Sequence, residues 1–333
     1  MAKSFISFQR KSRHQAASFK FRETSSDLLN DFLVDLNQVN KDNLDDLTKY
    51  SGSFKRKRFV EYVILMTEEL KLDPVVVHHA VELLQRFMVK HIADMLATIP
   101  LEGATANEAP IYEVFVHLKD KLPLIIFSCV QLASKYLLHQ PVASTAVQVL
   151  HSLGLRVSKQ TLLESELMVF KGLEYRLNVL NPLTYVEVIL EVLVHNEPSV
   201  PVEHLYPISH HVLLCITLDK AAIFESLLRF TTQCSSPSRE QREKFVKVTE
   251  DRMLLGAGVI AAATYISCIR KMQQVKGVLS INTLIPTQIL IAFSPNVTQV
   301  VGELSHLTGI SRRSIMDLSL VILGHITGTI SEM

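Results

Sequence analysis

Two patterns in this 333-residue chain contain residue types that occur in ligand sites. The string Gly256–Ala261 (GAGVIA) matches a turn that binds dinucleotide phosphates, but that turn works only between a strand and a helix. Residues from Asp251 onwards already follow a helical pattern, so we interpret the small residues as a place of close helix packing. His78-His79 and His210-His211 are adjacent pairs. Their side chains point about 100° apart on a helix, so neither pair can chelate a metal from one face.

No other grouping of nucleophile, acid, base or metal ligand stands out. The sequence has no P-loop, no G-x-S-x-G turn and no H-E-x-x-H pair, and its four cysteines lie far apart. We therefore predict no catalytic residue, no metal, no cofactor and no small-molecule substrate, and we expect a protein that is not an enzyme. The scattered cysteines fit a reducing compartment.

Two polar motifs could act by charge or by modification. The densest basic cluster consists of Lys55, Arg56, Lys57 and Arg58. It predicts either a nuclear import signal or nucleic-acid contact, or else the solvated first turn of a helix that begins near Phe59. Ser236-Pro-Ser-Arg239 resembles a substrate of proline-directed kinases, which makes Ser236 a candidate phosphorylation site. An ordinary polar linker is the alternative for this segment.

The composition is that of a globular protein with a sizeable core. Hydrophobic residues make up 48%, charged residues 20%, and the formal net charge is +1, so no chain-wide field draws the protein to nucleic acid or anionic lipid. The uncharged run Met253–Ile269 is shorter than the roughly 20 apolar residues of a membrane span. Prolines interrupt the next run, Val278–Val301. We predict buried helices, no membrane segment and no signal peptide.

The N-terminal 50 residues reverse their charge halfway. Residues 1–24 hold six lysines and arginines against one glutamate, without a hydrophobic period, and predict a mobile basic tail. Residues 25–50 hold six aspartates against two lysines. In that second stretch the apolar residues at helical spacing are Leu28, Leu29, Phe32, Leu33 and Leu36. We predict a short acidic amphipathic helix that packs either on this chain or on a partner.

The remaining chain predicts an all-α fold of two tandem five-helix bundles, residues 51–180 and residues 181–330. Small residues gather in the third helix of each half, at 128–134 and 256–263, and are typical of a central helix that its neighbours approach closely. The expected helices are 59–70, 77–95, 122–138, 142–152 and 162–177 in the first bundle, and 183–195, 203–230, 251–270, 296–308 and 312–326 in the second.

Two segments of the first bundle resemble the cyclin box. Gln131–Tyr136 (QLASKY) would lie on its third helix, and Leu163–Asn178 (LESELMVFKGLEYRLN) on its fifth. The resemblance covers roughly residues 55–190 well, whereas the second half is divergent and similar in architecture only. More narrowly, the chain resembles divergent cyclins that are associated with meiotic crossover formation.

The resemblance implies a partner-binding surface and a cellular role. In cyclins, the lysine of the third helix and the glutamate that opens the fifth contact the regulatory helix of a cyclin-dependent kinase. By motif these positions fall on Lys135 and Glu166, with Glu164 as a second candidate. The resemblance further implies meiotic crossover factors as partners and a location in the nucleus on meiotic chromosomes, with a cytoplasmic pool as an additional option.

Departures from the cyclin pattern leave alternatives open. Leu137 and Leu138 stand where cyclins carry two acidic residues, and Gln85 replaces the aspartate that usually pairs with a first-helix arginine, here Arg56. A scaffold that recruits crossover factors without a kinase is therefore one alternative. A nucleic-acid-binding protein of the transcription factor IIB type is another. The missing zinc ribbon and the balanced charge disfavour it, and we do not expect direct nucleic-acid binding.

Overall fold

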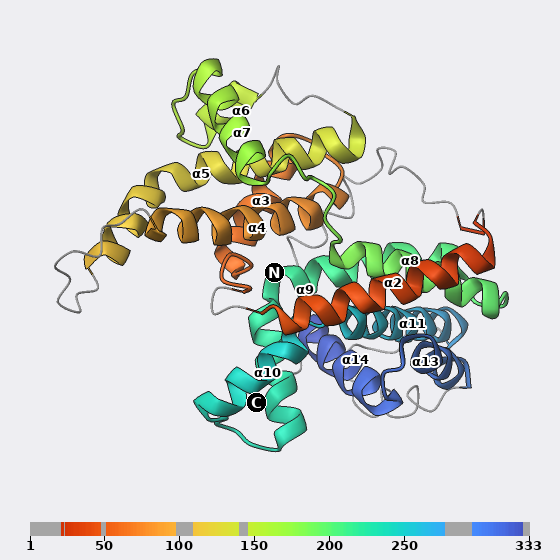
Figure 1. The fold of residues 1–333 in the computed structure, drawn as a ribbon. Helices are drawn as coiled ribbons and strands as arrows, with labels where there is room; N and C mark the ends of the chain where they lie inside the picture. Colours follow the sequence, from red (N-terminus) through yellow and green to blue (C-terminus); the bar gives the residue numbers. More distant parts are fainter. Residues whose placement is uncertain are drawn as a thin grey trace.

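The computed structural model describes residues 21–22, 24–47, 51–97, 109–139, 146–276 and 295–328. Over these ranges every regular element is a helix, which confirms the all-α prediction of two tandem bundles (Figure 1). The first bundle consists of α3 (Lys57–Glu69), α4 (Val75–Ala97), α5 (Ala109–Leu138), α6 (Ala146–Ser152) and α7 (Lys159–Gly172). The second consists of α8 (Pro182–Asn196), α9 (Val202–Thr232), α10 (Arg239–Glu250), α11 (Arg252–Lys276), α13 (Pro295–Thr308) and α14 (Arg312–Thr327).

Helix α5 is the central helix of the first bundle and packs on α3, α4 and α7. It begins at Ala109, well before the predicted start at 122, and continues through Pro123. A proline inside a helix removes one backbone hydrogen bond but need not end the helix when neighbouring helices hold both halves in place. Phe87 of α4 and Phe127 of α5 are both fully buried in the first core.

Local capping sets the starts of the helices on either side of the bundle boundary. The Ser158 hydroxyl accepts a hydrogen bond from the Thr161 amide and opens α7. The Asn181 side chain accepts from the amides of Leu183 and Thr184, while Pro182 occupies the first helical position of α8. These caps start α7 three residues and α8 one residue before the predicted positions, and α7 ends at Gly172, before its predicted end at 177.

Helix α11 is the central helix of the second bundle, and the expectation of close packing at its glycines is confirmed. A Cβ atom added at Gly258 would lie 2.5 Å from Leu318 Cδ2 on α14, and one at Gly256 would lie 3.0 Å from Ile189 Cδ1 on α8. The string at 256–261 lies within the helix rather than before it. The dinucleotide turn therefore does not form.

Helix α10 is an element that the hydrophobic pattern did not predict. Ser238 and Gln241 form a capping box at its start, and no residue of the helix is buried. Only Phe245 and Val248 pack partly against the second core, which leaves too few apolar positions for a period to be visible in the sequence. Its exposed surface carries the ion pairs Arg239–Glu243 and Lys244–Glu240, each between residues one turn apart.

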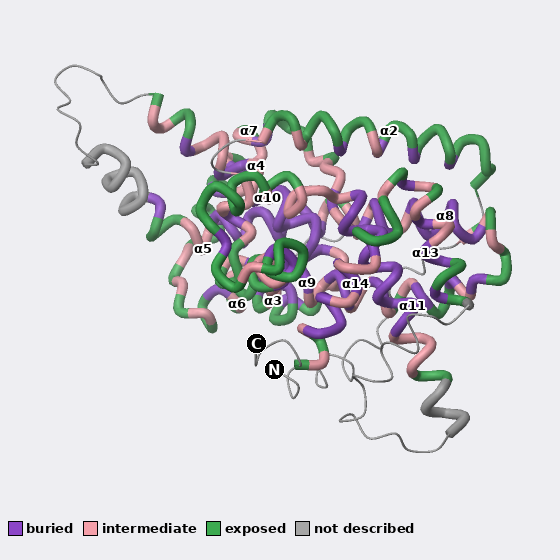
Figure 2. Tube along the Cα trace, turned by 90° about the horizontal axis from the view of Figure 1, so that it is seen from below, coloured by how far each residue is buried: buried purple, intermediate pink, exposed green. Residues whose placement is uncertain are grey.

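Helix α2 (Ser26–Asp45) is the predicted acidic amphipathic helix, and it packs on this chain. It lies along α8, with Leu29, Leu33 and Leu36 buried in the core of the second bundle (Figures 1 and 2). Phe21 and Arg22, just before it, also contact the second bundle. The predicted mobile tail falls almost entirely on residues outside the described ranges.

Two helical segments of the described chain are long and apolar enough to cross a membrane by length and composition, Leu118–Leu138 and Arg252–Lys271. Both belong to the central helices α5 and α11. Of their most apolar windows, 56% and 72% are buried inside the protein. The buried environment agrees with the prediction that the run at 253–269 is a core helix.

Candidate partner-binding surface

Lys135 and Glu166, the two residues singled out by the cyclin-box motifs, lie in direct contact. The Lys135 Nζ atom is 2.5 Å from Glu166 Oε1, and the Gln131 amide donates to Glu166 Oε2 at 2.7 Å. Beneath this pair, the hydroxyls of Ser128 and Ser165 share a buried hydrogen bond of 2.8 Å. Small side chains at that contact bring α5 and α7 close together, so the lysine and the glutamate meet at the seam between them.

The pair is placed at the surface rather than in the core. The Lys135 side chain is 37% exposed and Glu166 12%, so the ammonium group remains accessible from solvent while the carboxylate is largely covered. Both Glu166 oxygens already accept hydrogen bonds from α5. A partner that used this site would meet a preformed and oriented pair.

Glu164, the second candidate, is not brought to Lys135. It accepts a hydrogen bond of 2.9 Å from Gln160, one turn earlier on the same helix, and it is exposed. Two residues along a helix correspond to about 200° of rotation, so Glu164 and Glu166 point to different sides of α7.

An apolar strip on α7 runs beside Glu166, and the sequence reasoning did not single it out. Leu163 and Leu167 are each 49% exposed, and Phe170, on the same flank, is partly buried. The Phe170 ring packs edge-to-face against Tyr175, with ring centroids 5.1 Å apart. The spacing of 163, 167 and 170 was the available signal, because these positions share one helix face.

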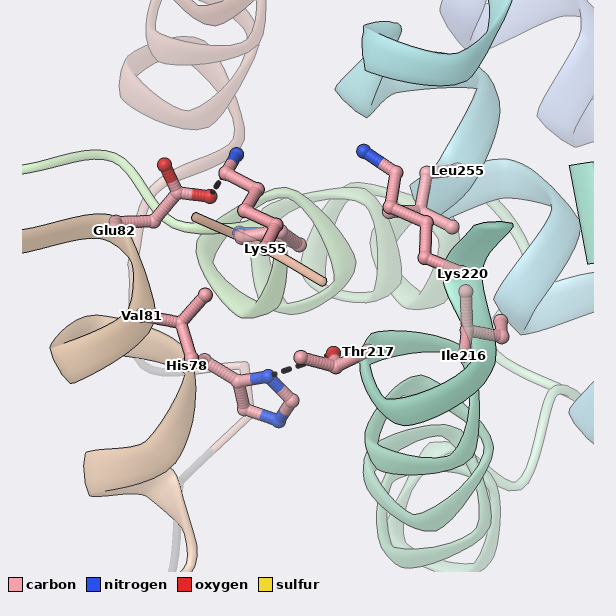
Figure 3. A pocket seen from close by; sticks show the side chains of 9 residues that line it. Lys55, His78, Val81, Glu82, Ile216, Thr217, Lys220 and Leu255 are labelled. Atoms are coloured by element: carbon pink, nitrogen blue, oxygen red, sulfur yellow. Dashed lines mark hydrogen bonds and ion pairs between the residues drawn. The ribbon is translucent and has the colours of Figure 1, made fainter. Parts of the chain in front are cut away.

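The adjacent histidines of α4 diverge, as predicted. His79 Nε2 lies 2.9 Å from the Leu177 carbonyl oxygen, and its ring stacks on Tyr136 with centroids 5.1 Å apart. Burial lowers the pKa of His79, and the hydrogen bond to Leu177 opposes that effect only in part. His78 points the other way, towards Thr217 of the second bundle (Figure 3).

The basic cluster at 55–58 is divided between the interior and the surface. Lys55 is only 10% exposed, and its Nζ atom lies 2.7 Å from Glu82 and 3.6 Å from Glu250. Lys57 pairs with Asp219 at 2.6 Å. The prediction of a solvated first turn is therefore wrong for Lys55, because long-range ion pairs that the sequence could not reveal cover it. The import-signal alternative stays a prediction, in which Arg56, Lys57 and Arg58 are the exposed cations of the cluster.

Five charged side chains connect the two bundles at this point. Arg252 pairs with Glu82 at 3.0 Å, and Lys220 pairs with Glu250 at 2.9 Å, in addition to the Lys55 contacts. Burial by itself would raise the pKa of Glu82, but the nearby charges of Arg252 and Lys55 outweigh it and bring the pKa to about 2. Lys55, Glu82 and Lys220 also line a cavity of about 30 Å³, room for roughly one water molecule (Figure 3).

Gln85 has a role that its motif position did not predict. Its side-chain oxygen accepts a hydrogen bond of 2.9 Å from the Phe54 amide. The carboxylate that pairs with a cation next to α3 comes instead from Glu82, one turn earlier on α4, and the cation is Lys55. The glutamine at position 85 implied that an ion pair between the start of α3 and α4 is missing. The Lys55–Glu82 ion pair makes this link instead.

Ser236 is exposed in the connection between α9 and α10, whereas Pro237 next to it is buried. The segment leads directly into the capping box of α10. Phosphorylation of Ser236 stays a prediction.

Two tandem helical bundles, with the cyclin-box motifs meeting on adjoining helices of the first, define a cyclin-like protein. The chain belongs to the family of cyclin N-terminal domain-containing protein 1. It is 35% identical to the mouse protein of that name over 94% of this chain and 87% of the mouse protein. It is also 35% identical to the human one, over 93% of this chain and 88% of the human protein. No protein-family model and no solved structure matches the chain.

Proposed function

We propose that this chain is a non-catalytic regulatory protein that binds a cyclin-dependent kinase through the surface of α5 and α7. The observation that supports the proposal best is the contact between Lys135 and Glu166, with the exposed Leu163 and Leu167 beside it. A charged pair next to an apolar strip suits a helix of a partner, because the strip buries apolar area and the charges fix the orientation. Drawing the kinase helix inward would complete the kinase's Lys–Glu ion pair.

The same proposal includes a biological setting. The protein would act in the nucleus on meiotic chromosomes and promote the designation and maturation of crossovers, together with crossover factors. This part rests on the resemblance of the chain to divergent meiotic cyclins and on its membership of the cyclin N-terminal domain-containing protein 1 family.

The double reversal Lys135→Glu with Glu166→Lys tests the kinase contact. Because the two residues pair with each other, the reversed chain can keep the internal ion pair and remain folded, while the partner meets the charges in exchanged positions. We expect at least a tenfold loss of co-purifying kinase and of histone-kinase activity when the tagged protein is isolated from meiotic tissue. The single change Lys135→Glu should lower binding as well, but it also breaks the internal pair.

A matched control is the double reversal Arg242→Glu with Glu225→Arg. These residues form an exposed cross-helix ion pair of 2.8 Å on the second bundle, far from α7 in the sequence. The control should leave kinase recovery unchanged. Equal kinase recovery from the Lys135/Glu166 reversal and from the wild type would contradict the proposed contact.

A kinase-independent scaffold is the second candidate function. Leu137 and Leu138 favour it, because they replace two acidic residues of the cyclin pattern directly after Lys135, and Leu138 packs against the first core. For this candidate, crossover factors should be recovered from meiotic tissue without a kinase, and the Lys135/Glu166 reversal should change nothing.

A further inference from the structure

Helix α2 carries an unusual outer surface in addition to the face that packs on α8. Leu28 is 61% exposed, Phe32 42% and Val39 38%. These three positions fall within about 40° of one another around the helix axis, so they form a single apolar row. From Leu28 to Val39 the row is about 17 Å long at 1.5 Å per residue.

A row of carboxylates runs beside the apolar row. Asp27, Asp31 and Asp35 follow each other at one-turn spacing and are all exposed. Like charges at this spacing destabilise a helix, and the helix dipole offsets the repulsion only in the first turn, where Asp27 lies. Within the part of the chain that the structure describes, no lysine, arginine or histidine forms an ion pair with any of the three.

Helix α10 provides an internal comparison. It is as exposed as the outer face of α2, but its charges are neutralised within the chain. Arg239 pairs with Glu243 at 2.8 Å, and Lys244 pairs with Glu240 at 2.7 Å. The carboxylate row of α2 thus differs from the carboxylates of α10, because its three members have no ion-pair partner among the described residues.

The outer surface of α2 is held rigidly in place. On its inner side, Leu29, Leu33 and Leu36 are buried against the second bundle. Asn40 fixes the far end, because its amide donates to Asp251 at 2.9 Å and its oxygen accepts from the Arg252 backbone at 3.0 Å. A partner would meet a preorganised surface and would pay little entropy for ordering it.

We propose that the outer face of α2 is a docking surface for a basic amphipathic helix of a partner protein. Cations spaced by one turn on that helix would face Asp27, Asp31 and Asp35, and its apolar residues would cover Leu28, Phe32 and Val39. The charge complementarity defines the partner: it must supply the positive charge that the described chain does not place next to this row. This surface is independent of the kinase contact on α5 and α7.

The test uses the full chain and a synthetic helical peptide of about 18 residues, with lysines at one-turn spacing beside a row of leucines. Binding is measured by fluorescence anisotropy. We expect the peptide to bind the wild-type chain. Its affinity should fall at least tenfold in the double variant Asp31→Asn with Asp35→Asn, and by the same factor in Phe32→Ser. It should also weaken as salt rises from about 0.05 to about 0.25 M, because exposed charges are screened over shorter distances at higher ionic strength. A peptide with glutamine in place of lysine should not bind.

Glu61→Gln with Glu69→Gln is the matched control, since both carboxylates are exposed on a different helix, α3. It should leave peptide binding unchanged, and circular dichroism should show that every variant is folded at the assay temperature. Absence of binding at low salt, or equal binding to the α2 variants, would overturn the proposal.

Two further outcomes would also overturn the proposal, because each would identify a different occupant of the outer face of α2. Binding that occurs only after Lys3, Arg10, Lys11, Arg13 and Lys20 are changed to glutamine would show that the chain's own N-terminus covers α2. A dimer in sedimentation that Asp31→Asn with Asp35→Asn dissociates would show that a second copy does.

Discussion

At the scale of single residues, the fold disfavours the charged form of Glu187. It lies on α8 and accepts a hydrogen bond of 2.7 Å from the Tyr206 hydroxyl. Burial raises the pKa of Glu187 from 4.5 to about 7, and the Tyr206 hydrogen bond counteracts this only in part. The folded chain therefore keeps the proton up to about pH 7, whereas the unfolded chain loses it near pH 4.5. Stability should fall as the pH rises between these two values.

Glu187→Gln should remove this fall. The amide keeps an acceptor for Tyr206 and carries no charge, so the variant should be more stable than the wild type by roughly 2–3 kcal/mol at pH 8. The two proteins should converge below pH 4.5, where the carboxyl is protonated in both folded and unfolded chains. Urea unfolding at a series of pH values measures this. The prediction would be contradicted by the same pH slope in both proteins.

At the scale of elements, the approach of α11 to α14 depends on a missing side chain at Gly258. An added Cβ would lie 2.5 Å from Leu318 Cδ2 and 2.9 Å from Leu318 Cγ. Gly258→Ala should therefore lower the free energy of unfolding by about 1–3 kcal/mol, because overpacking forces Leu318 or the helix to shift. Thermal unfolding followed by circular dichroism measures the effect.

Gly302 is the control for that substitution, since it also lies in a helix, α13. Its added Cβ would meet only the end of the Arg312 side chain, at 3.2 Å, which can move. Gly302→Ala should be neutral or stabilise by up to about 1 kcal/mol, because alanine has the higher helix propensity. Equal changes in unfolding free energy for Gly258→Ala and Gly302→Ala would mean that helix propensity, and not packing, determines the effect.

At the scale of the whole molecule, Glu82 joins the bundles. It is 8% exposed and pairs with Lys55, just before α3, and with Arg252 of the second bundle. Glu82→Gln would leave both cations without this counter-charge, and we expect a loss of about 3 kcal/mol in unfolding free energy at pH 7. The pKa of Glu82 is lowered from 4.5 to about 2, so its contribution is complete above pH 4.5 and lost as the pH falls towards 2. The difference between the two proteins should shrink over that window.

The exposed pair of Asp45 and Lys247 serves as the control, with side chains 76% and 62% exposed. Asp45→Asn should change stability by less than about 1 kcal/mol, since water and salt screen such pairs. If Glu82→Gln were as mild as Asp45→Asn in urea unfolding, the network would not hold the bundles together.

Local chemistry in the sequence predicted the helical class, the two bundles, the buried central helices and the family motifs. These rest on periodicity, caps and small residues, which are short-range features: Asn181 and Pro182 start α8, and the glycines of α11 mark a close contact. Helix α10 was missed because it has no fully buried residue and too few apolar positions for a visible period.

Tertiary structure alone decided which distant side chains meet. Lys135 and Glu166 are 31 residues apart and form a pair only because α5 and α7 lie side by side. Lys55 belongs to a surface-like basic string, yet carboxylates from α4 and α10 enclose it. The packing of α2 on α8, rather than on another helix, was likewise decided by the tertiary structure. The hydrophobic spacing of a helix predicts that one of its faces is buried, but which element covers that face follows from the three-dimensional arrangement of all the helices.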